Sequence, residues 1–258
     1  MPNNPIICII DFEMQLISLL SVSEVENANY SENPTRQHFF MFKKIISYLF
    51  PIRLKYLESP INGPMEVNLV DGRMTLDTQS SNYSYGSLQM ILHYGLEKIG
   101  LSNQTHKIML LGLGGGSVIQ TIREDFKCQA YIEAVDIDPV IIEMAVDDFK
   151  ISRFENIKII HADAYEFVMN SSDLFDLIIV DLFIIDTIPV IFTTPAFLDS
   201  LKNHLTSKGK IIYNTMKRTM STENLNLIKS QFEEDSHCHV KILKNVEGTN
   251  HLILVEKY

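Results

Sequence analysis

The sequence lacks the run of about 18 to 20 uncharged apolar residues that a membrane-spanning helix needs. Its best candidate, Ile6 to Leu20, is interrupted by Asp11 and Glu13. This stretch also lacks the basic flank of a secretory signal peptide, because the first basic residue of the chain is Arg36. We therefore expect neither a secretory signal nor a membrane partner.

Cysteine and positive charge are also scarce. The three cysteines, Cys8, Cys128 and Cys238, are scattered and form no CxxC pair, which argues against a disulfide framework or a metal site and favours the cytoplasm. The formal net charge of −10 leaves no basic footprint of the kind that nucleic-acid binding requires. What is present is a chain of 258 residues, 46% of them hydrophobic, which is long enough for one large domain and a small appended element.

Changes of pattern along the chain predict its organisation. Met65, Val67 and Leu69 alternate with polar positions, and Asp71-Gly72 then gives the two-residue signal of a β-hairpin turn. The expected divisions are an N-terminal extension that is partly flexible or helical (1–51), a small β-hairpin domain (52–80) and a Rossmann-like catalytic domain (81–258).

From Lys107 onward, hydrophobic strands alternate with helical segments. The strands are continuous runs rich in Val, Ile and Leu, which is typical of a parallel sheet covered on both faces. The predicted strands are Lys107–Leu111, Ala130–Asp136, Ile157–His161, Leu177–Asp181 and Lys210–Asn214. Two further runs near the C-terminus, Val240–Leu243 and Leu252–Val255, are joined by a short turn and predict an antiparallel pair. The expected fold is thus α/β, with a mostly parallel sheet and an antiparallel C-terminal hairpin.

The ends of successive strands carry groups suited to a nucleotide-like ligand. The first strand ends in the glycine-rich loop Gly112-Leu113-Gly114-Gly115-Gly116. Such a loop before a helix lets a ligand approach unpaired backbone N–H groups, although it can also be a tight turn without a ligand. Asp136, about 20 residues further on, is placed to bind ribose hydroxyls. Asp163 can accept a hydrogen bond from an adenine amino group or cap the helix that follows it. Asp181 ends the fourth strand and completes the rim.

These positions share one expected role, because the carboxyl ends of parallel strands meet at one edge of the sheet. The expected cofactor-binding residues are Gly112, Gly114, Gly115, Gly116, Asp136, Ile137, Asp163 and Ala164.

Several segments resemble the spermidine synthase family, especially its spermidine synthase-like branch. They are LLGLGGGSV, EAVDIDP, HADAYEFV, FDLIIVDLF and TTPAFLDSLKNHL, preceded by the hairpin VNLVDGRMTLDT and the helix start NYSYGSLQMILHYGL. The resemblance implies a class I S-adenosylmethionine-dependent methyltransferase fold with a small N-terminal β element, often as a homodimer. It also implies aminopropyl transfer from decarboxylated S-adenosylmethionine to a polyamine such as putrescine. By position, it assigns ribose to Asp136, adenine to Asp163, the catalytic carboxylate to Asp181 and the polyamine site to Tyr85. A buried core tyrosine is the alternative for Tyr85.

Two positions depart from the family's pattern and keep another reaction open. Gly115 stands where the family carries an aspartate that holds the donor's amine, and the second aspartate of the fourth strand is displaced to Asp186. Both changes remove acidic contacts that a cationic amine would use. A methyltransferase that uses intact S-adenosylmethionine on an unknown small acceptor is therefore the second hypothesis. A nicotinamide-dependent oxidoreductase and a binding module without turnover are further alternatives. The acidic strand ends and the antiparallel pair argue against the oxidoreductase.

Overall fold

The computed structural model describes residues 34–78, 82–84 and 87–258. The chain separates into two compact units, and their described parts are 34–55 with 68–73, and 56–67 with 74–78, 82–84 and 87–258. Among the described residues, no helix has both the length and the apolar character that crossing a membrane requires.

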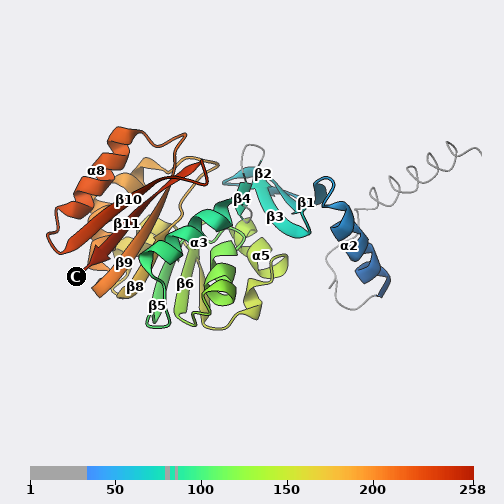
Figure 1. Cartoon of the computed structure of the whole chain (residues 1–258), viewed down its shortest axis with the longest axis horizontal. Coiled ribbons are helices and arrows are strands. Elements are labelled where there is room, and N and C mark those ends of the chain that lie inside the picture. Colours follow the sequence, from blue (N-terminus) through green and yellow to red (C-terminus); the bar gives the residue numbers. More distant parts are fainter. Residues whose placement is uncertain (1–33, 79–81, 85–86) are drawn as a thin grey trace, which may run out of the picture. The chain divides into compact units, whose positions relative to one another are not determined.

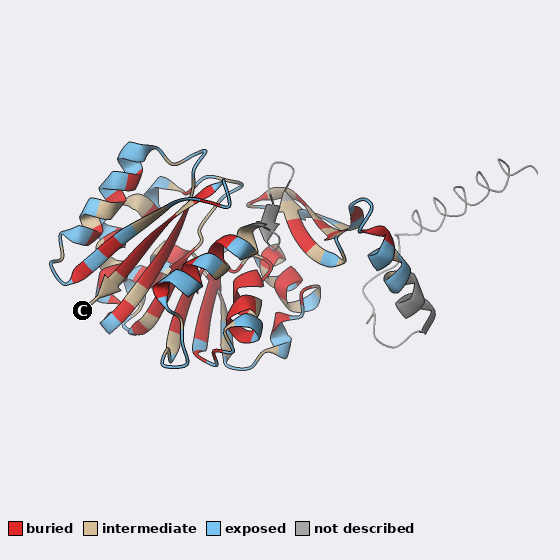
Figure 2. Cartoon of the chain, in the orientation of Figure 1, coloured by how far each residue is buried: buried red, intermediate tan, exposed pale blue. Residues whose placement is uncertain are grey.

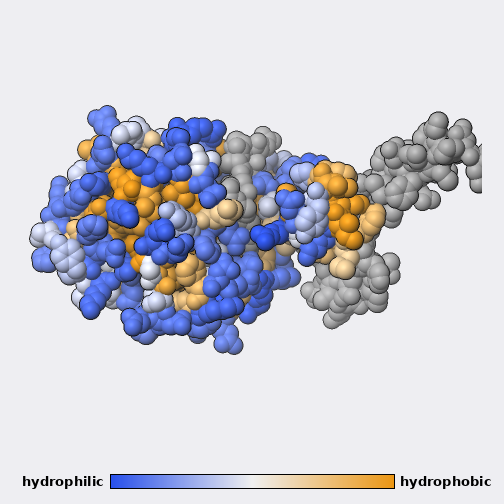
Figure 3. Space-filling view, in the orientation of Figure 1, coloured by the Kyte–Doolittle hydropathy of each residue, from blue (hydrophilic) through white to orange (hydrophobic). Residues whose placement is uncertain are grey.

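The first unit contains helix α2 (Pro34–Ile46) and the turn of a hairpin. Ser47 ends the helix and holds that turn, because its hydroxyl donates to the carbonyl of Lys44 and accepts a hydrogen bond from the N–H of Gly72 at 2.9 Å. Large apolar side chains are exposed along the end of α2 and the residues that follow it (Figure 3), namely Met41, Phe42, Ile45, Leu49 and Phe50.

A four-stranded sheet precedes the large domain. Its strands, in the order β1-β2-β3-β4, are β1 (Ile52–Ser59), β2 (Gly63–Val70), β3 (Arg73–Thr78) and β4 (Asn82–Ser84). The predicted hairpin turn lies between β2 and β3, and Asp71 and Gly72 both have positive φ, at 49° and 74°. That backbone matches the twist of the two strands on either side. Met65, Val67 and Leu69 are buried as their alternation predicts.

The large domain is built on a seven-stranded sheet (Figure 1) in the order β10-β11-β9-β8-β5-β6-β7. Its strands are β5 (Lys107–Leu111), β6 (Tyr131–Asp136), β7 (Ile157–His161), β8 (Phe175–Val180), β9 (Leu205–Met216), β10 (Cys238–Val246) and β11 (Asn250–Lys257). Strands β5 to β9 pair in parallel, whereas β11 pairs antiparallel with both β9 and β10. The predicted fold class is confirmed, and the order reverses direction between β5 and β8, the point at which open α/β sheets bind ligands.

Helices cover both faces of this sheet, so that its central strands are mostly buried, whereas the edge strands β7 and β10 are partly exposed (Figure 2). The helices are α3 (Ser87–Ile99), α4 (Ser117–Gln120), α5 (Pro139–Asp147), α6 (Ala164–Asn170), α7 (Pro195–Asn203) and α8 (Thr222–Glu233). The last three form one apolar core with the sheet, around Phe197 and Phe232. On the other face, Gly95 lets α3 lie directly on Leu252 and Ile212.

Short helical segments complete the connections between strands. A π-helical turn, Thr121–Asp125, continues α4, and two 3-10 turns lie at Ile151–Arg153 and Val190–Thr193. The residue that caps α4 is Gly116 rather than a side-chain cap, and Ser117 is the first helical residue.

Candidate active site

The glycine-rich loop passes very close to the end of β8. Gly112, Gly114 and Gly116 have φ angles of 91°, 52° and 80°, a region that residues with a side chain rarely adopt. A Cβ atom on Gly112 would lie 2.1 Å from the carbonyl oxygen of Asp181. The absence of a side chain at Gly112 therefore lets the loop and the end of β8 meet, at the reversal point of the sheet.

Asp136 holds the loop against the end of β6. Its carboxylate accepts hydrogen bonds from the N–H groups of Leu113 (2.9 Å), Gly114 (3.4 Å) and Asp138 (2.9 Å). Burial raises the pKa of this carboxyl, while the three backbone N–H groups oppose that rise. A carboxylate offers about four acceptor positions, so that one remains for a ligand hydroxyl.

Asp138 joins the β1–β2 turn to the same rim. Its carboxylate is fully buried, caps α5 by accepting from the N–H of Val140, and accepts from the Ser59 hydroxyl and the Asn62 side-chain amide. Asp138 is thus both the N-cap of α5 and the link to the β1–β2 turn. The amide oxygen of Asn62 is buried and has no hydrogen-bond partner within the part of the chain that the structure describes.

Asp163 lies beside Asp136 through the register of the sheet. Asp136 pairs with His161 of β7, and the N–H of Ala162 donates to the carbonyl of Asp136 at 3.0 Å. One carboxylate oxygen of Asp163 caps α6 by accepting from the N–H groups of Tyr165 (2.8 Å) and Glu166 (3.1 Å). The capping interpretation is therefore confirmed. It does not compete with ligand binding, because capping occupies only one of the two oxygens.

The two residues expected to bind a ligand beside these aspartates differ in exposure. Ile137 is 44% exposed, and its carbonyl lies 3.0 Å from Nε2 of His161. Ala164 is 5% exposed and its methyl group packs in the core. Ile137 can therefore offer a side chain to a ligand, whereas Ala164 can offer only backbone.

Asp181 follows β8 and is held from two sides. Its N–H donates to the carbonyl of Leu111 at 2.8 Å, and its carboxylate accepts from the side-chain amide of Asn214 at 2.8 Å. Burial raises the pKa of Asp181 to about 6. Asn214 opposes the rise and the charge of Asp136 adds to it. Both residues contact the glycine loop, Asp136 through the N–H of Leu113 and Asp181 through its carbonyl beside Gly112.

The segment after Asp181 folds back on itself. Leu182 and Phe183 pack against the core, and Ile184 and Thr187 form an isolated antiparallel bridge. Asp186 does not face the rim as an unpaired charge, because it forms an ion pair with Arg218, just beyond β9. The segment after Asp181 is therefore apolar at Leu182 and Phe183, and its one carboxylate, Asp186, is neutralised by Arg218.

The predicted site residues meet at one rim, with one exception. Asp136 and the backbone of Asp181 each contact the glycine loop, and Asp163 follows by register. Tyr85 lies outside the described residues. Sequence reasoning missed Asn62 and Asn214. The predicted fifth strand ends at Asn214, so its end could have been inspected for polar groups as the other four were.

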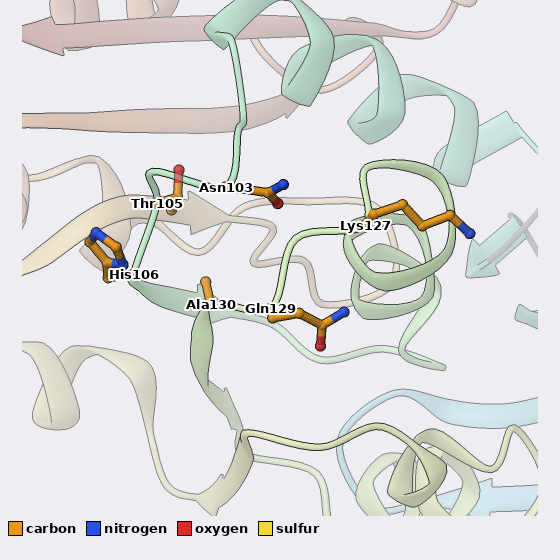
Figure 4. A pocket seen from close by; sticks show the side chains of 6 residues that line it. All are labelled: Asn103, Thr105, His106, Lys127, Gln129 and Ala130. Atoms are coloured by element: carbon orange, nitrogen blue, oxygen red, sulfur yellow. The ribbon is translucent and has the colours of Figure 1, made fainter.

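A pocket of about 270 Å³ lies elsewhere, at the opposite edge of the sheet, where β5 and β6 begin (Figure 4). Its polar side chains point in different directions, and those of His106, Lys127 and Gln129 are exposed. We therefore place the candidate active site at the rim. Within the described residues, no group of three or more His, Cys, Asp or Glu side chains could hold a metal ion.

Comparison with known proteins gives one family. The model of the spermine/spermidine synthase domain matches residues 86–243. A polyamine aminopropyltransferase of Vibrio vulnificus (strain CMCP6) is 30% identical over 112 residues, which are 42% of this chain and 37% of that protein. An eEF1A lysine and N-terminal methyltransferase of Bos taurus is 29% identical over 128 residues, which are 45% of this chain and 18% of that protein. This chain thus spans well under half the length of either relative.

A solved structure has the same fold. The crystal structure of a spermidine synthase in complex with the transition-state analogue AdoDATO matches with a TM-score of 0.65 and 16% identity, over 80% of this chain and 74% of that one. At this identity the likeness concerns the fold.

Proposed function

The chain belongs to the spermine/spermidine synthase domain family, and from that premise we propose that it is a spermidine synthase-like transferase with an S-adenosyl sulfonium donor. Its first candidate reaction is aminopropyl transfer from decarboxylated S-adenosylmethionine to a polyamine such as putrescine. One observation carries the proposal. A glycine loop and aspartates from the ends of β6, β7 and β8 lie at one rim of the sheet, with Asp136 bonded to the loop and the backbone of Asp181 against it.

The residues of the rim fit an adenosyl group. Asp136 would hold the ribose through its remaining acceptor position, and the second carboxylate oxygen of Asp163 would accept from the adenine amino group. The buried amide oxygen of Asn62 needs a donor, because an unsatisfied buried acceptor costs about 1–3 kcal/mol. A ligand hydroxyl or amine would satisfy it. Ile137 offers an apolar side chain to the adenine.

Asp181 is the proposed catalytic carboxylate. In the transfer, the amine nitrogen attacks the carbon bonded to the sulfonium sulfur, and the electrons of the carbon–sulfur bond pass to sulfur. The leaving thioether is neutral, so that the reaction needs neither a metal ion nor an acid. The amine must lose a proton, because its pKa is near 10 like that of lysine. With a pKa of about 6, Asp181 is ionised at neutral pH and can accept that proton or hold the amine in line.

Methyl transfer from intact S-adenosylmethionine is the second candidate, and two observations favour it. Gly115 replaces an aspartate, so that the methionyl carboxylate meets no acidic side chain there. Asp186 is paired with Arg218 and does not offer a negative charge to a second amine. An acceptor with a single amine suits this arrangement better than a diamine.

Two measurements test the proposal. The first is calorimetric titration with S-adenosylmethionine, its decarboxylated form and methylthioadenosine, for which we expect binding of methylthioadenosine and of at least one donor. The second is incubation with an amine panel and donors labelled in the methyl or the aminopropyl group, where the labelled product distinguishes the two reactions. Binding of NADH without binding of any adenosyl sulfonium would contradict the proposal. Ligand binding without product from either label would indicate a binding module.

The proposal includes three expectations from the sequence. The acceptor is a small molecule, the enzyme acts in the cytoplasm, and two copies form a homodimer. Tyr85, outside the described residues, is proposed to close the acceptor side of the site. Light scattering of the purified chain tests the homodimer, and a monomer at micromolar concentration would refute it.

A further inference from the structure

Two buried asparagines form a hydrogen-bonded chain that ends on Asp181. Asn250 at the start of β11 donates its side-chain amide to Oδ1 of Asn214 at 2.9 Å, and Asn214 donates to Oδ1 of Asp181 at 2.8 Å. Asn250 and Asn214 are 1% and 0% exposed. A buried amide that lacks a hydrogen-bond partner costs free energy. Here each asparagine is satisfied by the next group of the series.

The register of the sheet brings these groups together. Val180 of β8 pairs with Tyr213 of β9, so that the next residues, Asp181 and Asn214, lie side by side at the rim. Tyr213 points into the core on the α7 side, where its hydroxyl donates to the carbonyl of Phe192. Side chains alternate along a strand, and Asn214 therefore points to the opposite face, where α3 lies.

The order of donors and acceptors in this chain is fixed by its end. An ionised carboxylate can only accept hydrogen bonds, so that Asn214 must present its NH2 group to Asp181 and its oxygen to Asn250. Asn250 must then donate. Asn250, on the strand next to β9, thus holds the oxygen of Asn214 and supports the orientation that Asp181 requires.

We propose that Asn214 is a positioning residue for Asp181, and that Asn250 acts through Asn214 by holding the oxygen of its amide. Asn214 holds Oδ1 of Asp181, which leaves the other carboxylate oxygen for the acceptor amine. This inference rests on the proposed function only for the role of Asp181 in catalysis. The hydrogen-bonded chain itself can be tested without any substrate.

The charged surroundings of Asp181 are simple enough for such a test. Asp136 on β6 is the charged group that acts on it and raises its pKa, while β9 contributes the amide that lowers it. A hydrogen bond to a charged group contributes about 1.5–3 kcal/mol, and about 1.4 kcal/mol corresponds to one pKa unit. Loss of the Asn214 amide should therefore raise the pKa of Asp181 by about one to two units.

The test is a carboxyl-carbon NMR titration of the full chain with labelled aspartate, in which the Asp181 signal is assigned with Asp181→Asn. Asn214→Leu should raise the pKa of Asp181 by about one to two units, and Asn250→Leu should raise it less. Thr215→Val is the matched control. It removes a buried hydrogen bond to the carbonyl of His251 from the next residue of β9, and it should leave the pKa unchanged.

An unchanged pKa in a folded Asn214→Leu protein would overturn the proposal, and so would an equal change in Thr215→Val. If Asn214→Leu does not fold, Asn250→Leu carries the same test. Once a donor and acceptor are known, the acidic limb of the pH–rate profile should move with the pKa of Asp181. If the acidic limb does not move, Asn214 and Asn250 do not affect catalysis through Asp181. If no transfer occurs at all, the proposed function fails, whereas the NMR result still decides the positioning claim.

Discussion

Replacement of Gly112 by alanine tests whether the loop and the end of β8 must touch. The added Cβ would lie 2.1 Å from the carbonyl oxygen of Asp181, and backbone rather than a flexible side chain stands in its way. Gly112 also has a φ angle of 91°. Two effects therefore combine in Gly112→Ala, one from the backbone angle and one from the collision.

Gly248 separates these effects, because its φ of 77° is similar but a Cβ added to it would have no heavy atom within 4 Å. Gly248→Ala should lower the free energy of unfolding by the backbone contribution alone, about 1–2 kcal/mol. Gly112→Ala should lower the free energy of unfolding by that amount and by about 1–3 kcal/mol more, because the added Cβ collides with the backbone of Asp181. It should also move Asp181 away from the loop, and a displacement of about 1 Å in a catalytic site can reduce the rate about 100-fold.

The assay combines urea denaturation with calorimetric titration of methylthioadenosine. We expect both variants to be destabilised, and affinity to fall at least tenfold, about 1.4 kcal/mol, in Gly112→Ala alone. Equal losses of stability and equal affinities in the two variants would refute the close contact. Unchanged affinity in a clearly destabilised Gly112→Ala protein would mean that the contact is structural and that the ligand binds elsewhere.

Three further predictions concern the carboxylates of the rim. Because burial raises the pKa of Asp181 from 3.8 to about 6, the native state binds the extra proton between these pH values. Stability should then fall by up to about 3 kcal/mol as the pH rises from 4 to 6. Asp181→Asn should lack this decrease in denaturation measured at each pH. Asp136→Asn should weaken methylthioadenosine binding at least tenfold, since its NH2 group would face loop N–H groups, and calorimetry that finds unchanged affinity would contradict this. Arg218→Gln should release Asp186 and increase the affinity for a diamine several-fold over that for a monoamine of equal length. An unchanged ratio would contradict this role of the ion pair.

The fold was largely predictable because its signals are local. Continuous apolar runs identified each strand of the large sheet, and the ends of β5 and β7 agree with the prediction to the residue. The prediction was wrong at β9, which begins at Leu205 rather than at Lys210. Its first residues are mostly polar, and they form a strand only because β8 pairs with Leu205 before the register shifts. Such pairing is a tertiary effect that a hydrophobic pattern does not contain.

The position of the candidate site in the fold was predictable where its residues lie at the ends of strands. Glycines after β5 and aspartates at the ends of β6 and β8 could be found because parallel strands place their ends together. Asn62 could not be found in this way. It meets Asp138 across 76 positions of sequence, and nothing in the composition of the β1–β2 turn indicates that contact.

In the proposed transferase, the charges of the rim would distinguish a donor side from an acceptor side. On the donor side, Asp136 and Asp138 are bonded to backbone N–H groups and neutral side chains, so that their positions are fixed by hydrogen bonds. On the acceptor side, Arg218 neutralises Asp186, while Asp181 is held by the neutral amide of Asn214 and keeps its charge. A single negative charge beside an apolar turn attracts one ammonium group and offers nothing to a second. Under the proposed function, the arrangement of these partners, rather than the number of aspartates in the sequence, would therefore determine which amines the site accepts.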